Sequence, residues 1–190
     1  MATPPRYPAD SGYQGPPDPS VLAGDYNVSE FMIRQIMAGL ATATLAIVQG
    51  VSAGANGGTV DVQPLVSQVT GGGTPVAHGT VYGLPYVRLQ AGTSAVILDP
   101  VVGDIGLVVF CSRDISVVKA TGAVAAPGSR RQFDMADGIY LGGVLNGAPT
   151  RFVRMNAEGI QITDPTKITL TAPDVEINGR LLVKENAHFE

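Results

Sequence analysis

The hydrophobic positions near the start of the chain follow a helical period. The run NVSEFMIRQIMAGL (27–40) predicts a helix that ends near Gly39, within an N-terminal segment spanning 25–40. Ser29 is the expected N-cap, which places the negative charge of Glu30 in the first turn, where it suits the helix dipole. The apolar stripe consists of Phe31, Ile33, Ile36, Met37 and Leu40. Such a stripe fits packing against the core of the chain or a contact between subunits.

From Ala41 onward the hydrophobic period changes to two, which predicts β-strands. The strand-like runs are ATLAIVQGVSA, TVDVQPLVSQV, GTVYGLPYVRL, SAVILDPVVGDIGLVVFCS and FDMADGIYLGGVL. The first two predict a hairpin around a glycine-rich loop at 54–58, and RDISVVKAT predicts one or two helical turns. Five or six short strands joined by glycine turns favour a small closed or nearly closed barrel. We therefore expect an OB-like barrel domain over residues 41–156.

The last part of the chain, 157–190, alternates in short bursts. The apolar positions on one parity are Ile160, Ile162, Ile168, Leu170, Val175, Ile177, Leu181 and Val183. The bursts recur every seven to eight residues, and a repeat this short cannot bury a core of its own. Three copies wound around a common axis would let these eight side chains fill a shared core, with Leu182 as the outward-facing exception. The sequence thus predicts a short intertwined trimeric β-helix, and the competing interpretation is a loose C-terminal hairpin.

Two further segments limit what the chain can do. Residues 1–24 contain six prolines and little to bury, which predicts a flexible arm. That arm is either a frayed terminus or a strap over a neighbouring subunit, and its lack of an apolar core excludes a signal peptide. No charged residue occurs between 35 and 60, but the apolar run IMAGLATATLAIV is shorter than the roughly 20 residues that a membrane-spanning helix needs. We expect no transmembrane segment.

Composition supports an all-β chain and argues against nucleic acid as a partner. The 190 residues include 24 glycines and 14 prolines, and only 15% of residues are charged. The net charge of −4 and the low aromatic content of 6% do not suit a basic groove with stacking platforms. The single cysteine, Cys111, excludes an intrachain disulfide and fits a reducing site of synthesis.

The sequence contains no pattern of residues that predicts catalysis. Nucleophile elbows, paired cysteines and zinc-binding histidine motifs do not occur, so we expect no catalytic, cofactor-binding or metal site. Cys111 lies in an apolar strand and is expected to be inert, while Asp134 and Asp137 are expected to be turn and surface carboxylates. His188, near the terminus, is either frayed or one of three imidazoles that meet on a threefold axis and hold a metal loosely.

Four segments in the same order resemble the central baseplate spike of contractile-tailed bacteriophages. They are TVDVQPLV, PVVGDIGLVVFCSRDIS, GSRRQFDMADGIYLGG and ITDPTKITLTAPDVEINGRLLV, and the resemblance covers roughly residues 26–185. It implies a homotrimer with an N-terminal OB-fold and a C-terminal trimeric β-helix. Family members often have a longer β-helix that ends in a His-x-His pair binding iron, and this chain has neither. Iron is therefore not expected here.

The resemblance implies a mechanical function within the virion. The spike would dock on tail hub or tube proteins, with the arm and the first helix as candidate attachments, and would pierce the host outer membrane on tail contraction. The chain would be synthesised in the host cytoplasm, and its short tip is either capped by a separate protein or naturally blunt. A different class of function stays open, a non-enzymatic OB-like adaptor that binds a protein or peptidoglycan ligand through its loops. A small hydrolase would need convergent residues that the sequence does not have.

Overall fold

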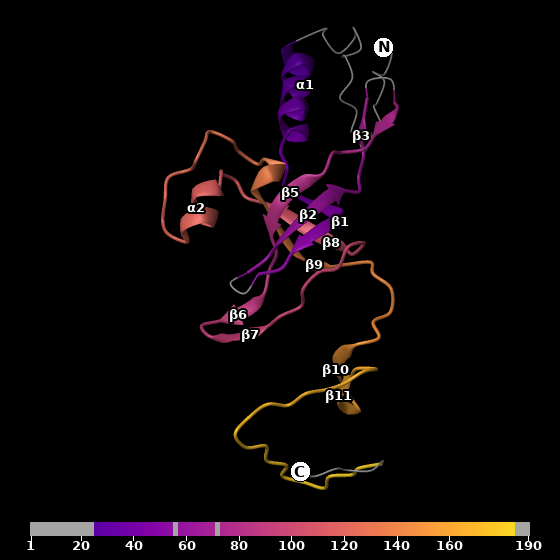
Figure 1. Cartoon of the computed structure of the whole chain (residues 1–190). Coiled ribbons are helices and arrows are strands. Elements are labelled where there is room, and N and C mark those ends of the chain that lie inside the picture. Colours follow the sequence, from indigo (N-terminus) through magenta and orange to yellow (C-terminus); the bar gives the residue numbers. More distant parts are fainter. Residues whose placement is uncertain (1–24, 55–56, 71–72, 185–190) are drawn as a thin grey trace. The chain divides into compact units, whose positions relative to one another are not determined.

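The computed structural model describes residues 25–54, 57–70 and 73–184. The chain divides into two compact units, Met1–Asn146 and Gly147–Glu190 (Figure 1). The predicted arm at 1–24 and His188 lie outside the described residues. The prediction of an all-β chain is confirmed to the extent that the chain is mostly β with few helices.

The first unit contains a five-stranded sheet in the order β5-β2-β1-β8-β9. Its strands are β1 (Ala43–Ser52), β2 (Thr59–Pro64), β5 (Val81–Pro85), β8 (Ile105–Phe110) and β9 (Gly138–Gly143). All neighbouring strands pair antiparallel. The sheet curls into a half-barrel, because the segment after β5 reaches β9 through a parallel bridge between Tyr86 and Tyr140. The Val87 backbone N–H donates to the Tyr140 carbonyl across this bridge, at 2.9 Å.

The concave side of the sheet holds the hydrophobic core. Alternate residues of β1 and β2 are buried, as the period of two predicts, because successive side chains of a strand point to opposite faces. The buried hydrophobic residues are Ala46, Val48, Val60, Val62, Leu84, Tyr86, Val108 and Tyr140. They come from all five strands or the residue after β5, so the core forms only when the sheet curls.

Two glycines make room for the two bridging tyrosines. A Cβ added at Gly58 would overlap the Tyr86 ring, and a Cβ added at Gly106 would overlap the Tyr140 ring. Neither glycine has a positive φ, so the requirement is space and not backbone conformation. Each ring therefore lies directly on the backbone of the neighbouring strand, the Tyr140 ring on β8 and the Tyr86 ring at the start of β2. Such close contacts let a small unit fill its core without tryptophan.

Several short elements extend from the sheet. These are the hairpins β3 (Gln68–Val69) with β4 (Pro75–Val76) and β6 (Leu89–Ala91) with β7 (Ser94–Val96), the helix α2 (Ser116–Thr121) and the 3₁₀ turn η2 (Met135–Asp137). The run GTVYGLPYVRL, which predicted one strand, divides into β5 and β6. The run FDMADGIYLGGVL begins with η2 before β9, because the Asp134 carboxylate accepts from the Ala136 N–H at 2.9 Å and caps a turn there.

A polar cluster anchors the α2 excursion to the sheet. Arg131 lies 3.1 Å from Asp114 and 3.2 Å from Asp137, and the Ser129 hydroxyl donates to Asp114 at 2.6 Å. The Ile115 N–H donates to Asp137 at 3.1 Å. Asp137 is only 1% exposed, so its expected place on the surface is wrong. Sequence spacing could not reveal this, because the partner that makes burial tolerable, Arg131, lies in an irregular loop.

The helix α1 spans Asp25–Ala38, and none of its residues is buried. It begins four residues before the expected N-cap, so the capping role of Ser29 is wrong. The Ser29 hydroxyl instead donates to the Asp25 carbonyl one turn earlier, at 2.8 Å. Glu30 and Arg34 form an ion pair of 2.7 Å along the helix. Within the described residues, neither α1 nor α2 has the length and apolar content to cross a membrane.

The second unit begins with a hairpin of β10 (Phe152–Asn156) and β11 (Gly159–Thr163). An ion pair of 3.0 Å between Arg151 and Asp164 closes its open end. Residues 164–184 form no strand within the chain, although three of the predicted strands lie there. The boundary between the units falls at Gly147, earlier than the predicted 157, because β10 pairs with β11 and not with the curled sheet.

Candidate assembly surfaces

The predicted trimer core positions are all exposed in the single chain. Their exposed fractions run from 48% at Val183 to 72% at Leu170, and the set comprises Ile160, Ile162, Ile168, Leu170, Val175, Ile177, Leu181 and Val183. The structure brings the first two together on β11, whereas the other six lie along a segment without strand pairing. A regular series of exposed apolar side chains is typical of an interaction surface.

The β10–β11 hairpin has one apolar face and one polar face. Cross-strand pairing sets Val153 opposite Ile162 and Met155 opposite Ile160 on the apolar face. All four side chains are more than half exposed. The opposite face carries Phe152, Arg154, Gln161 and Thr163, with the Arg154 guanidinium 4.7 Å from the centre of the Phe152 ring.

Sequence reasoning missed Val153 and Met155 as parts of this surface. The predicted boundary at 157 assigned both residues to the barrel. Their signal was present in the run RFVRMN, where the apolar residues 153 and 155 alternate with polar ones. The pattern alone could not show that these residues pair with 160 and 162 and so extend the apolar face of the second unit.

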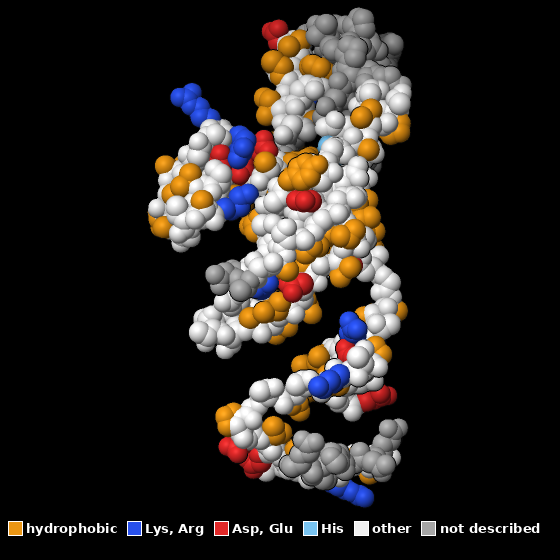
Figure 2. Space-filling view, viewed as in Figure 1, with side chains coloured by type: hydrophobic (Ala, Val, Ile, Leu, Met, Phe, Trp, Pro, Cys, Tyr) orange, Lys and Arg blue, Asp and Glu red, His pale blue; other side chains and the backbone are white. Residues whose placement is uncertain are grey.

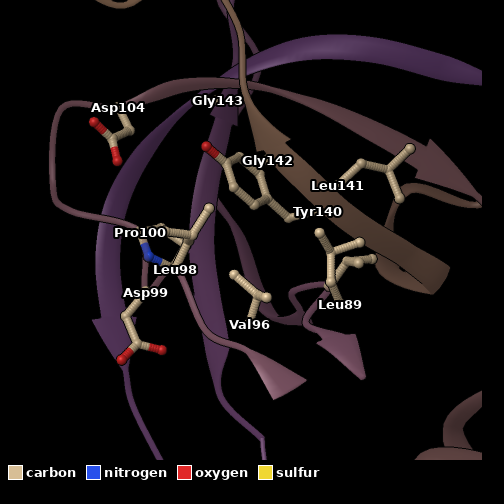
Figure 3. Close-up of a pocket in the computed structure, with 11 residues that line it drawn as sticks. Leu89, Val96, Leu98, Asp99, Pro100, Asp104, Tyr140, Leu141, Gly142 and Gly143 are labelled. Carbon is tan, nitrogen blue, oxygen red and sulfur yellow. The ribbon is translucent and has the colours of Figure 1, made fainter. Parts of the chain in front are cut away.

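A shallow hollow of about 250 Å³ lies beside the curled sheet. Its apolar side chains include Leu89, Val96, Leu98 and Leu141. In Figure 3 Leu98 and Val96 lie beside the Tyr140 ring, whereas Leu141 and the Asp99 carboxylate point away from it. Leu89 and Leu98 are 68% and 76% exposed. In Figure 2, hydrophobic side chains lie over this part of the first unit, around β6 and β7. The hollow is smaller than the roughly 300–1,000 Å³ that is typical of small-molecule sites.

Polar groups around the hollow hold its wall to the curled sheet. The Tyr86 hydroxyl donates to the Asp99 carboxylate, and the Arg88 guanidinium lies 3.3 Å from that carboxylate and 5.6 Å from the Tyr86 ring centre. The hydrogen bond with Tyr86, followed by the charge of Asp99, raises the pKa of Arg88. Burial, followed by the charge of Asp104, raises the pKa of Tyr140, so this phenol stays protonated and cannot serve as a base at neutral pH.

The third surface is the α1 stripe, which we define as Tyr26, Met32, Ile33, Ile36, Met37 and Leu40. Each of these side chains is between 42% and 78% exposed. The opposite face of the helix, with Asn27, Phe31 and Gln35 at four-residue spacing, is half-buried. Hydrophobic side chains along α1 are visible in Figure 2. An amphipathic helix usually turns its apolar face inward, whereas the apolar face of α1 is exposed, which makes it a candidate assembly surface.

The described residues contain no metal-binding cluster. In the ranges 25–54, 57–70 and 73–184, no three His, Cys, Asp or Glu side chains lie where they could hold one ion. Cys111 is half-buried and its backbone N–H donates to the Asp137 carbonyl at 3.0 Å. His188, the candidate axial ligand, lies outside the described residues.

Comparison with known proteins identifies the curled sheet. Residues 46–143 match the family model described as the phage protein Gp138 N-terminal domain. The match begins within β1 and ends at the last residue of β9, so it covers the five paired strands and the excursions between them. No curated protein matches the chain. The helix α1 and the second unit lie outside the matched range.

Proposed function

The chain belongs to the family of the phage protein Gp138 N-terminal domain, which indicates a phage structural protein related to the baseplate, and on this premise we propose that it forms the homotrimeric central spike of a phage tail. In this proposal the trimer sits at the distal end of the tail tube in the virion. It docks on tail hub proteins and crosses the host outer membrane when the tail contracts. A separate protein caps the short tip.

We assign the first unit to the OB-fold class on its strand connections. Three consecutive antiparallel strands, β1, β2 and β5, form a meander, and β8 pairs with β1 on its other side. The last strand, β9, pairs with β8 and meets the end of β5 in parallel at Tyr86. Closure of a five-stranded sheet in this manner is the arrangement of the partly open OB barrel. Such a barrel gives the spike a compact base for docking.

The main support for the proposed trimer is the series of exposed apolar side chains in the second unit. Burying a Val, Leu or Ile side chain stabilises by about 1.5–3 kcal/mol, and eight predicted positions per chain are available, besides Val153 and Met155. Residues 164–184 have no strand partner within the chain, so their backbone N–H and C=O groups can pair with neighbouring copies. Three copies satisfy both requirements together.

The mechanical role follows from such a shaft. Axial load on an intertwined β-helix would be distributed over many inter-chain hydrogen bonds, and unwinding would require that many break together. The proposal needs no catalytic group and no cofactor, and in it the apolar hollow by Leu98 serves a protein contact. The role of piercing therefore depends on stiffness and shape.

The direct test is the mass of the purified chain in solution, measured by light scattering after size-exclusion chromatography. We expect three times the chain mass of 19.6 kDa. We also expect Leu170→Asp to shift the mass toward the single chain, because a buried charge in the shared core is costly. Thr169→Asp is the matched control, since residue 169 has the opposite parity and should leave the trimer intact.

A monomeric wild-type chain at micromolar concentration would overturn the spike. If that monomer also bound a protein or peptidoglycan fragment saturably, the adaptor function would replace it. Equal loss of the trimer in both variants would show that parity does not define an inward face. If both variants kept the trimer mass, the second unit would have no role in assembly.

A further inference from the structure

The α1 stripe has the spacing of a coiled-coil seam. Ile33 and Leu40 are seven residues apart, Tyr26 precedes Ile33 by seven, and Ile36 lies three after Ile33. In a heptad lettered a to g, Tyr26 and Ile33 occupy a, whereas Ser29 and Ile36 occupy d. Leu40 continues the spacing two residues beyond the end of α1. Met32 and Met37 then fall at the flanking g and e positions. The exposed large apolar residues of α1 are therefore those that face a partner helix in a coiled coil.

We propose that α1 packs against the α1 helices of two further copies of this chain and forms a parallel three-helix seam on the threefold axis. This inference rests on the trimer proposed above. Cyclic symmetry about one axis makes the three helices parallel, and each can turn the same stripe inward. The half-buried face with Phe31 and Gln35 then remains on the outside of the seam.

The residue types favour three helices over two. Isoleucine at both a and d, as at Ile33 and Ile36, favours assemblies larger than a dimer. The stripe is also wider than a dimer seam, which covers mainly a and d, because Met32 and Met37 extend it on both sides. These methionines are 52% and 64% exposed in the single chain, and a third helix would bury them. An unrelated hub protein would not require a heptad pattern in this helix.

Charges near the start of the helix are compatible with the seam. Asp25 at g and Glu30 at e would approach each other across neighbouring chains and repel. Glu30 already pairs with Arg34 of its own helix at 2.7 Å, which offsets this repulsion. Asp25 lies in the first turn, where the helix dipole stabilises a negative charge. The repulsion is therefore confined to the first turn, and the isoleucine layers lie beyond it.

The seam needs the rest of the trimer to form. A helix of 14 residues offers two heptads, which is marginal for an isolated coiled coil. If the second unit already holds three chains together, the effective concentration of α1 rises to the millimolar range. The seam would then form as an intramolecular step and stabilise the base of the spike, so the full chain is the correct material for a test.

The test is thiol cross-linking of the full chain in a Cys111→Ala background. Ile36→Cys puts a thiol in the seam, whereas Ala38→Cys puts one on the opposite side of the same helix. Helix axes in a seam lie about 8–10 Å apart, within reach of a short two-armed thiol reagent. Thiols on the outer sides would be roughly 20 Å apart, given a helix diameter of about 10–12 Å. We expect severalfold more covalent dimer from Ile36→Cys, up to two of every three chains.

The solution mass of each sample is measured alongside the cross-linking. A three-chain mass with equal cross-linking in both variants would overturn the seam alone, and would leave the α1 stripe to a different protein. A single-chain mass would overturn the proposed trimer and the seam with it. Because Cys111→Ala could disturb folding, a second comparison uses Ile36→Asp and Ala38→Asp with Cys111 intact. The seam requires a lower melting temperature for Ile36→Asp only, and equal melting temperatures would overturn it.

Discussion

The contact between Gly106 and Tyr140 offers a direct test of how the curled sheet closes. Gly106 lies in β8, is buried and has an extended backbone that alanine also adopts. A Cβ there would overlap the Tyr140 ring, which is 1% exposed and fully packed. Gly106→Ala therefore changes one contact without changing the backbone requirement. The ring cannot move outward without opening the bridge between Tyr86 and Tyr140.

The expected cost is the difference of two effects. Overpacking a well-filled core costs about 1–3 kcal/mol. Alanine is favoured over glycine within a strand by roughly 0.5–1 kcal/mol, which offsets part of that cost. The net loss in the free energy of unfolding should be about 1–2 kcal/mol, or a fall of roughly 1 M in the urea midpoint when the urea slope is about 1–3 kcal/mol per molar.

The assay is urea unfolding followed by tyrosine fluorescence and far-UV circular dichroism at one fixed protein concentration, since assembly makes the midpoint concentration-dependent. Gly79→Ala is the control, because no atom lies within 4 Å of a Cβ at that exposed glycine. It should leave the midpoint unchanged or raise it slightly. In a Tyr140→Leu background the Gly106→Ala cost should largely vanish, because the clashing ring is gone. An unchanged midpoint for Gly106→Ala alone, or an undiminished cost without the ring, would refute the reasoning.

Three further predictions follow from single contacts. Tyr140→Phe should leave stability unchanged or raise it by about 1 kcal/mol, because the buried hydroxyl has no hydrogen-bond partner among the described residues, and a clear loss in urea unfolding would reveal one. Asp114→Asn should destabilise the chain at pH 7 yet flatten its acid-unfolding profile. Hydrogen bonds from Ser116 and Ser129, together with the charge of Arg131, hold the pKa of Asp114 below its usual range. The ionised carboxylate therefore adds to the free energy of unfolding above the unfolded pKa of about 3.9, and this stabilisation is lost as pH falls below that value. An equally steep acid profile in the variant would contradict this. Met155→Asp should weaken the trimer while Arg154→Asp on the polar face should not, as measured by light scattering, and equal effects would show that the hairpin's apolar face has no role in assembly.

The candidate surfaces depended on single-chain facts that no sequence pattern states. The helical stripe of 27–40 was open to core packing or a subunit contact, and only the exposure of Ile33 and Ile36 shows that the described part of the chain does not pack over them. Val153 and Met155 could be assigned to the apolar face of the hairpin only from the strand register that pairs them with β11. Asp137 looked like a surface carboxylate until the fold placed Arg131 against it.

By itself, the sequence determined the local periods of this protein: a helix ending beside Gly39, alternating strands through the barrel, and a short repeat in the tail. Those features follow from side-chain spacing along the backbone, which a single chain carries without reference to distant residues. Only the tertiary structure decided the curl of the sheet, the bridge between Tyr86 and Tyr140, the glycine sites beneath their rings and the unit boundary at Gly147. These depend on residues far apart in the chain meeting in space. Their geometry is set by how volume, charge and hydrogen bonds are satisfied together, and local spacing does not contain that information.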